Sequence, residues 1–346
     1  MPAAAQLGPC PSGLIGAAPL PSRSRARTAC ATITAVKPKV IVDCDPGHDD
    51  AVALLVAARH ADLLGVTTVS GNVPLPLTTA NALLVTELAG IDVEVHEGAD
   101  RPLVVEPAHA SHVHGKTGLD GSPRPEATRR PSGRDAVEFI VETVRAVDDV
   151  WLVPIGPLTN IARALRAAPD IAERVAGISL MGGGDAVGNV TAVAEFNAWA
   201  DPHAAAEVFA SGVARLMMLG LNLTHQFTVD AAVLERLRDG DGAGPRTVGT
   251  FVAGLFEFYL AANKSENGLD FAALHDPCAV LAVTHPTLFA FQSRHVAVAV
   301  DDELTRGMTV VDHRPLRSQP PNCEVATHID RDTAMEIVIA AVCSFE

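Results

Sequence analysis

From Lys39 onward, short runs of apolar and β-branched residues alternate with longer stretches whose apolar positions recur at helical spacing. The short runs predict buried strands, and the longer stretches predict amphipathic helices. The predicted strands are 40–43, 63–69, 93–96, 150–153, 177–181 and 215–219, and the predicted helices are 49–60, 78–89, 135–146, 159–168 and a short one after Pro202. Because parallel strands need crossover helices, this alternation predicts an α/β fold with a doubly wound, mostly parallel sheet and helices on both faces.

The rest of the chain is less regular. Residues 106–134 are rich in Pro, His, Gly and Arg and have no strand or helix period, which is typical of an ordered functional loop. A long helical pattern runs from about 247 to 264, and a polar stretch then leads to His275. Short strands are expected within 294–330 and a closing helix over 332–343. No repeat or internal boundary is evident, so residues 37–346 are expected to form one domain.

Polar and glycine residues are concentrated where the predicted strands end. They occupy 43–50, 70–72, 154–160, 182–197 and 222–225. Ligands of doubly wound sheets bind beyond the carboxyl ends of the strands. The sequence therefore predicts the functional site at this edge of the sheet.

Residues 1–36 differ in composition from the rest, since Ala, Pro, Ser and Arg dominate and no acidic residue precedes Asp43. Three interpretations fit this segment: an organelle transit peptide, a disordered tail, or an extension created by a start codon placed too far upstream. No clear amphipathic stripe accompanies its arginines, which weighs against the transit peptide. We exclude it from the fold and expect a cytoplasmic protein, with an organelle as the alternative if the segment is a transit peptide.

The chain carries a formal net charge of −15, which repels phosphate backbones and anionic membranes. No basic patch after residue 40 would offset this repulsion, so no nucleic acid or membrane partner is expected. The six cysteines form no CxxC pair, which favours a reducing compartment. No apolar run approaches the roughly 20 residues of a membrane-spanning helix.

Four carboxylates lie within eight residues, directly after the first predicted strand, in the segment Asp43-Cys44-Asp45-Pro46-Gly47-His48-Asp49-Asp50. A tight turn at Pro46 and Gly47 and a helix start can account for one or two of them. Carboxylates crowded at the end of a buried strand need a cation or shared protons. A hard divalent ion bound through oxygen atoms is the simplest solution.

The segment DCDPGHDDA resembles the amino-terminal signature of the inosine-uridine-preferring nucleoside hydrolase family. Further stretches of residues 39–346 follow in the order of that family, which makes the set far more specific than any single motif. They are Val69-Ser70-Gly71-Asn72, His114-Gly115, Gly156-Pro157-Leu158-Thr159-Asn160, Leu180-Met181-Gly182-Gly183-Gly184, Gly188-Asn189, Ala194-Glu195-Phe196-Asn197, Asp201-Pro202 and His275-Asp276-Pro277.

The resemblance implies a calcium-dependent enzyme that hydrolyses ribonucleosides to a free base and ribose. It implies a calcium ion held by Asp45, Asp50, Asp276 and the backbone carbonyl of Thr159, with Asp45 also taking the proton of a bound water. It implies ribose contacts from Asp49 and Asn72 at the 2′-hydroxyl, Asn197 and Asp276 at the 3′-hydroxyl, and Asn189 and Glu195 at the 5′-hydroxyl. Met181 is expected in the wall of the substrate pocket, and a homodimer or homotetramer is expected.

These residue types suit the chemistry independently. Cleavage of an N-glycosidic bond builds positive charge on the sugar, so it needs anionic surroundings, a positioned water with a base, and a group that neutralises the departing nucleobase. His275, beside Asp276, is one candidate acid, and His114 in the segment HGKTGLDG is a second. That segment resembles the loop of pyrimidine-leaning members of the family.

Two departures from the family pattern stand out. Some members carry an aromatic residue before the His-Asp pair that contacts the base, but residues 263–274 contain only Phe271, which puts purine selectivity in doubt. The usual Asp after the strand 215–219 is Asn222, which is expected to shift metal affinity. The alternatives are a haloacid dehalogenase-type phosphatase, for which a suitably placed lysine is lacking, and a non-catalytic calcium- and ribose-binding protein.

Overall fold

The computed structural model describes residues 36–244, 246–268, 271–315 and 319–346, so the interpretations of 1–36 fall almost wholly outside the described residues. Within them, eight strands form one sheet in the order β3-β2-β1-β4-β5-β6-β12-β9. The strands are β1 (Lys39–Cys44), β2 (Asp62–Thr68), β3 (Val95–Glu97), β4 (Val150–Pro154), β5 (Gly177–Met181), β6 (Leu216–Leu219), β9 (Phe289–Arg294) and β12 (Cys323–Ile329). All pairings in the sheet are parallel except that of β12 with β9, so the predicted mostly parallel α/β sheet is confirmed.

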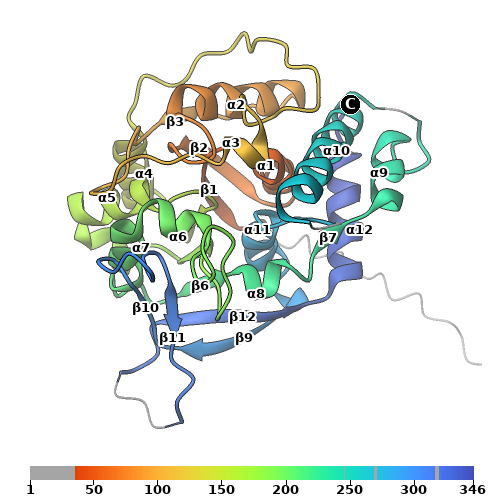
Figure 1. The fold of residues 1–346 in the computed structure, drawn as a ribbon. Helices are drawn as coiled ribbons and strands as arrows, with labels where there is room; N and C mark the ends of the chain where they lie inside the picture. Colours follow the sequence, from red (N-terminus) through yellow and green to blue (C-terminus); the bar gives the residue numbers. More distant parts are fainter. Residues whose placement is uncertain (1–35, 245, 269–270, 316–318) are drawn as a thin grey trace, which may run out of the picture. The chain divides into compact units, whose positions relative to one another are not determined.

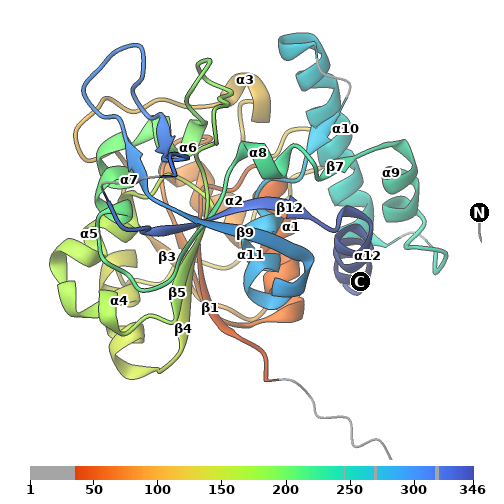
Figure 2. The same ribbon diagram turned by 90° about the horizontal axis from the view of Figure 1, so that it is seen from below.

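Helices cover both faces of this sheet, as Figures 1 and 2 show. One face packs against α1, α2, α10, α11 and α12, and the other against α4, α5 and α7. The longer helices are α1 (His48–His60), α2 (Leu75–Leu88), α4 (Ala136–Ala146), α5 (Thr159–Ala167), α7 (Pro202–Phe209), α9 (Ala231–Arg238), α10 (Thr247–Asn267), α11 (Pro277–Thr284) and α12 (Arg331–Val342). Shorter turns are α3 (Ser111–His114), α6 (Phe196–Ala200), α8 (Leu221–Thr224) and the 3₁₀ segments Pro169–Glu173 and Pro286–Leu288.

The alternation of side chains along β1 determines which face of the sheet Asp43 points to. Val40 and Val42 join the core under α1, whereas Ile41 joins the core under α4 and α5. Asp43 has the parity of Ile41 and therefore faces α5, where Asn160 meets it. β1 is central, paired with β2 on one side and β4 on the other, so every charge at its carboxyl end is buried.

Two small sheets complete the described structure. One is the hairpin of β10 (Val296–Val298) and β11 (Thr309–Val311), and the other pairs β7 (Thr228–Val229) with β8 (Ala272–Ala273). The hairpin reaches the segment after β5, since Ala194 forms a bridge with Met308 and Thr309 Oγ1 bonds to the backbone of Gly184. Strand order reverses between β1 and β4, which is where a doubly wound sheet opens a crevice for a ligand.

Some elements differ from the sequence prediction. Residues 106–134, expected to be an ordered loop, include one helical turn, α3. α11 was not predicted because its residues from Pro277 to Ala282 are all buried, which removes the polar face that gives a helix its period. Within the described ranges, no helix is both long and apolar enough to cross a bilayer.

The buried Asp201 ties three segments together, which yields a stability prediction. It caps α7 by accepting from Ala204 N (3.0 Å), and it also accepts from Leu103 N (2.8 Å) and Thr159 Oγ1 (2.7 Å). Asp201→Ala leaves these buried donors unpaired and should lower the free energy of unfolding by about 3 kcal/mol. Urea denaturation followed by circular dichroism measures the change.

The matched control is Asp230→Ala, which removes an exposed aspartate that caps α9 through Val233 N. Its expected cost is about 1 kcal/mol. Equal losses in the two variants would show that Asp201 acts only as a helix cap.

Candidate active site

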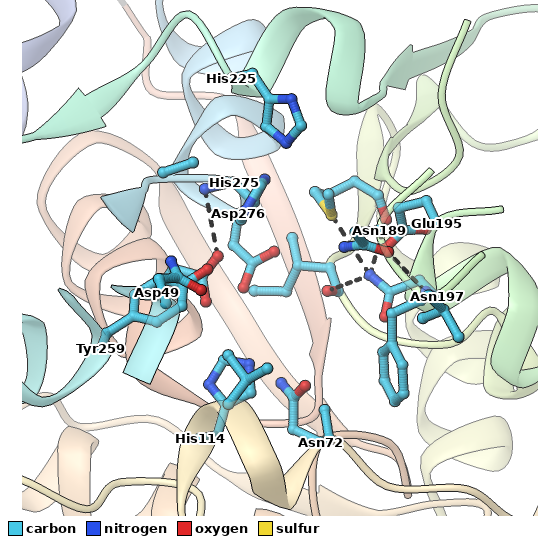
Figure 3. Close-up of a pocket in the computed structure, with 18 of the residues that line it drawn as sticks. Asp49, Asn72, His114, Asn189, Glu195, Asn197, His225, Tyr259, His275 and Asp276 are labelled. Carbon is cyan, nitrogen blue, oxygen red and sulfur yellow. Dashed lines mark hydrogen bonds between the residues drawn. The ribbon is translucent and has the colours of Figure 1, made fainter. Parts of the chain in front are cut away.

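An open cavity of about 520 Å³ lies at the carboxyl edge of the sheet. Its walls come from the ends of several strands and from the middle of α10, as Figure 3 shows. Predicted site residues that line it are Asp49, Asn72, His114, Met181, Asn189, Glu195, Asn197, His275 and Asp276. Residues far apart in the sequence thus share one cavity, as the polar segments after the strands led us to expect.

Three carboxylates form a buried cluster at the cavity, and two of them, Asp49 and Asp276, line it. Asp49, Asp50 and Asp276 each offer an oxygen atom, and these atoms lie within 4.8 Å of one another. Asp50 is held by backbone N–H groups, since its Oδ2 accepts from Gly47 N (2.8 Å) and its Oδ1 from Asp45 N (3.2 Å). The cluster is therefore fixed by the turn that begins α1, and it could hold a metal ion.

Asp45 adds a fourth buried carboxylate beside this cluster. Its Oδ2 accepts from the backbone N–H of Asn72 (2.7 Å), whereas its Oδ1 is buried without a hydrogen-bond partner among the described residues. Gly71 and Gly156 lie against the two oxygens, and a Cβ atom at either position would overlap them. Asp45 is thus packed against two glycines and keeps one oxygen without a partner, which a cation could bind.

Burial is the main reason that these carboxylates have unusual proton affinities. It raises the pKa of Asp49 to about 7, with Asp50 as the next cause, and it raises the pKa of Asp45 and Asp276 well above the ordinary value. The described lining of the cavity includes no Lys or Arg to compensate. A divalent cation would stabilise the ionised forms and remove their mutual repulsion.

Asp43 stands apart from the cluster because it faces α5. Its Oδ1 accepts from Thr67 Oγ1 (2.6 Å) and from Asn160 Nδ2 (2.8 Å), and burial raises its pKa to about 7. Thr159, which begins α5, is absent from the cavity lining, and its hydroxyl donates to Asp201. Asp43 therefore supports the N-terminus of α5 instead of facing the ligand.

The opposite wall of the cavity is built by α6 and the segment before it. Glu195 caps α6, accepting from Asn197 N (2.9 Å), and its other oxygen accepts from Gly183 N (2.8 Å). Asn197 Nδ2 donates to the carbonyls of Ile155 (3.0 Å) and Met181 (3.2 Å), which joins α6 to the ends of β4 and β5. These bonds fix polar oxygens on the side of the cavity away from Asp49.

His275 and His114, the two candidate acids, lie on different sides of the cavity (Figure 3). His275 Nδ1 lies 2.7 Å from Thr224 Oγ1, and its backbone N–H donates to Asp49 Oδ2 (3.3 Å). Burial lowers the pKa of His275 to about 3 and lowers that of His114 well below its ordinary value. Both rings are thus neutral near pH 7, and a role as an acid requires a proton supplied during the reaction.

The cavity lining also contains polar and aromatic residues that had no predicted role, among them His112, His225, Tyr259 and Asn263. An aromatic residue that contacts the base was expected within 263–274, but Tyr259 lies one helical turn before Asn263 on the same face of α10. That four-residue spacing was the signal that could have found it. Asn222 lies outside the lining. It donates to Ala326 O (2.9 Å) and accepts from Asp185 N (3.2 Å), so it links β12 to the segment after β5.

Comparison with known proteins places the chain in a family. A model of the family described as "inosine-uridine preferring nucleoside hydrolase" matches residues 40–336. A pyrimidine-specific ribonucleoside hydrolase, RihA, of Shewanella sp. (strain MR-7) is 42% identical over 305 residues, which cover 87% of this chain and 94% of that protein. An uncharacterised protein of Schizosaccharomyces pombe is 39% identical and covers 87% and 97% of the two chains.

Solved structures agree with this placement. The purine-preferring ribonucleoside hydrolase of Gardnerella vaginalis superimposes with a TM-score of 0.82 at 32% identity, over 88% of this chain and 98% of that one. The plant nucleoside hydrolase PpNRh1 gives a TM-score of 0.81 at 31% identity, over 89% and 99%. With the acidic cluster at the expected edge of the expected sheet, the chain belongs to the inosine-uridine preferring nucleoside hydrolase family.

Proposed function

We propose that this protein hydrolyses the N-glycosidic bond of ribonucleosides, releasing a free base and ribose, with calcium as its cofactor. The observation that carries the proposal is the buried cluster of Asp49, Asp50 and Asp276, two of which line a cavity that Glu195 and Asn197 also line. Anionic surroundings stabilise the positive charge that develops on the sugar in the transition state. The proposed catalytic unit is the whole of residues 37–346.

The residues that would hold the ion are Asp45, Asp50, Asp276 and the carbonyl of Thr159. Support comes from the unpaired Asp45 Oδ1 and from the raised pKa values of the buried carboxylates, which a divalent cation would reverse. An all-oxygen set of this kind suits calcium. When bound, the ion would hold a water molecule and make it more acidic.

Asp45 is the proposed base. Its Oδ2 accepts from Asn72 N, which fixes the carboxylate plane, so Oδ1 would both bind the ion and accept the proton of the attacking water. Because Oδ1 has no other described partner, the proton transfer breaks no existing hydrogen bond of Asp45. Gly71 and Gly156 pack directly against its two oxygens, so neither position tolerates a side chain without moving the carboxylate.

The sugar would lie between the two polar walls. Asp49 and Asn72 are assigned to the 2′-hydroxyl, Asn197 and Asp276 to the 3′-hydroxyl, and Asn189 and Glu195 to the 5′-hydroxyl, with Met181 against the ring. All seven line the cavity. His275 and His114 are assigned to the base end of the site, which is also lined by His225, Tyr259 and Phe271.

Pyrimidine ribonucleosides are the proposed substrates, because a relative at 42% identity is named as pyrimidine-specific. Tyr259 adds an aromatic side chain to that of Phe271 in the cavity, so purine ribonucleosides are the alternative substrates. Initial rates with uridine, cytidine, inosine and adenosine separate the two.

We also propose a cytoplasmic homodimer or homotetramer, for which light scattering gives the mass in solution.

Asp45→Asn should reduce kcat by about 10³-fold or more, because the amide cannot accept the proton of the water. The rate of ribose release from uridine measures the effect. Asp62→Asn is the matched control, since Asp62 is exposed at the start of β2 and far from the cavity along the strand. An Asp45→Asn enzyme as active as this control would exclude Asp45 as the base.

Ribonucleosides should be cleaved up to about 10⁴-fold more efficiently than 2′-deoxyribonucleosides, measured as kcat/KM. A deoxyribose would leave the buried acceptors Asp49 and Asn72 without a partner. Uridine and deoxyuridine assayed side by side test this expectation. Equal turnover of the two would contradict the assignment of the 2′-hydroxyl contacts.

Calcium removal should abolish activity, and calcium should raise the melting temperature of the chelated protein because it binds only the folded state. Differential scanning calorimetry with and without added calcium measures the shift. Asp50→Asn should lose this shift, while Asp62→Asn should keep it. A chelated protein that stays fully active would refute the cofactor assignment.

A further inference from the structure

His48, the first residue of α1, is fully buried and has no assigned role in the reaction. Its ring joins two groups of the 106–134 loop. Nε2 lies 2.9 Å from the carbonyl oxygen of Asp120, and Nδ1 lies 3.0 Å from Nδ1 of His114. The two imidazole planes are inclined by only 22° with ring centroids 5.1 Å apart, so their facing nitrogen atoms meet edge to edge.

The partners of His48 determine where its proton lies. A carbonyl oxygen can only accept, so Nε2 of His48 must carry the hydrogen in the contact with Asp120. The ring is fully buried and its two partners, a carbonyl and an imidazole, are uncharged, which favours the neutral form. Nδ1 of His48 is therefore a lone pair, and the hydrogen of the 3.0 Å contact must come from Nδ1 of His114.

A second contact of His114 Nδ1 favours the opposite tautomer, but it is longer. The backbone N–H of His48 lies 3.4 Å from His114 Nδ1, and accepting from it would require a lone pair there. That arrangement would place two lone pairs 3.0 Å apart between the rings. Because the ring contact is shorter and the alternative is repulsive, the hydrogen belongs on Nδ1 of His114.

The surroundings hold both rings in this relation. Tyr259 contacts both rings, with its centroid 5.5 Å from that of His48 and 5.7 Å from that of His114. The carbonyl of Asp120 is aimed by its own loop, since the Asp120 carboxylate accepts from Lys116 N (3.1 Å) and Thr117 N (3.2 Å). The segment HGKTGLDG thus closes on itself and presents a fixed acceptor to His48.

We propose that His48 is a positioning residue that fixes His114 in the Nδ1–H tautomer, so that His114 presents Nε2 to the substrate as a hydrogen-bond acceptor. His114 lines the cavity beside Asn72 (Figure 3). Its Nδ1 side is closed by His48 and Gly47. The acceptor would take a hydroxyl or N–H group of the nucleoside, which rests on the proposed function. Proton donation to the leaving base then falls to His275 and not to His114.

Two substitutions of His48 separate its two hydrogen bonds. His48→Asn keeps an oxygen near the position of Nδ1, which can accept from His114, but loses the bond to Asp120. His48→Gln reaches Asp120 with its amide but leaves His114 Nδ1 without an acceptor. Phe258→Leu is the packing control, because Phe258 stacks on His48 at 5.5 Å and makes no hydrogen bond to it.

The tautomer of His114 is read by ¹⁵N correlation spectra of histidine-labelled protein without substrate, with the His114 signals assigned by their loss in His114→Gln. We expect Nδ1–H in the wild-type protein, in His48→Asn and in Phe258→Leu, and a shift towards Nε2–H in His48→Gln. For turnover of uridine, His48→Gln should raise KM about 10-fold with little change in kcat, since one hydrogen bond in the bound complex is lost. His48→Asn should remain within about 3-fold of wild type.

An Nε2–H tautomer of His114 in the wild-type protein overturns the proposal, and this reading remains decisive even if both His48 variants fail to fold. Equal KM changes in His48→Asn and His48→Gln also overturn it, because packing alone would then explain them. The tautomer is measured without turnover. An Nδ1–H result in a protein that cleaves no nucleoside would therefore refute the proposed function and leave the role of His48 supported.

Discussion

The mutual repulsion of carboxylates at the buried end of β1 is the constraint on which the rest of the site depends. Asp45, Asp49, Asp50 and Asp276 are all buried, and the described cavity walls offer no cationic side chain near them. The structure limits the cost with backbone N–H donors at the start of α1 and with glycines that let the oxygens approach. These donors and glycines still leave one oxygen of Asp45 without a partner. Because a buried charged oxygen needs a partner, the fold itself creates the need for a cation at this place.

Much of this arrangement could be predicted from the sequence. The central strands have clear apolar runs, so β1, β4 and β5 were located to within about a residue, and their parallel order follows from the helices between them. Residues in the segments that follow strands, such as Asn72 after β2 and Glu195 after β5, reach the site because all parallel strands end at the same edge. Their predicted ligand and substrate roles rest on the family resemblance, since spacing places a side chain but does not name what it binds.

The remainder depends on contacts that no local pattern encodes. Tyr259 and Asn263 reach the cavity only because α10 crosses the face of the sheet near α1. The edge-to-edge pairing of His48 with His114 joins residues 66 positions apart, and the sequence gives each of them only as a histidine beside a glycine. Thr159 shows the converse: it lies where the motif predicts, yet its hydroxyl is engaged with Asp201 and only its backbone could serve a metal.

The hydrogen bond from the backbone of His275 to Asp49 closes a loop of 226 residues, and this has a consequence for synthesis of the chain. A ribosome has to translate most of the protein before Asp276 can join the aspartates made at the beginning. β12, which separates β6 from β9, emerges later still. Contacts of such long sequence separation form slowly because the chain entropy is lost before the contact is gained. The acidic end of β1 therefore spends much of translation without the segment that completes its site.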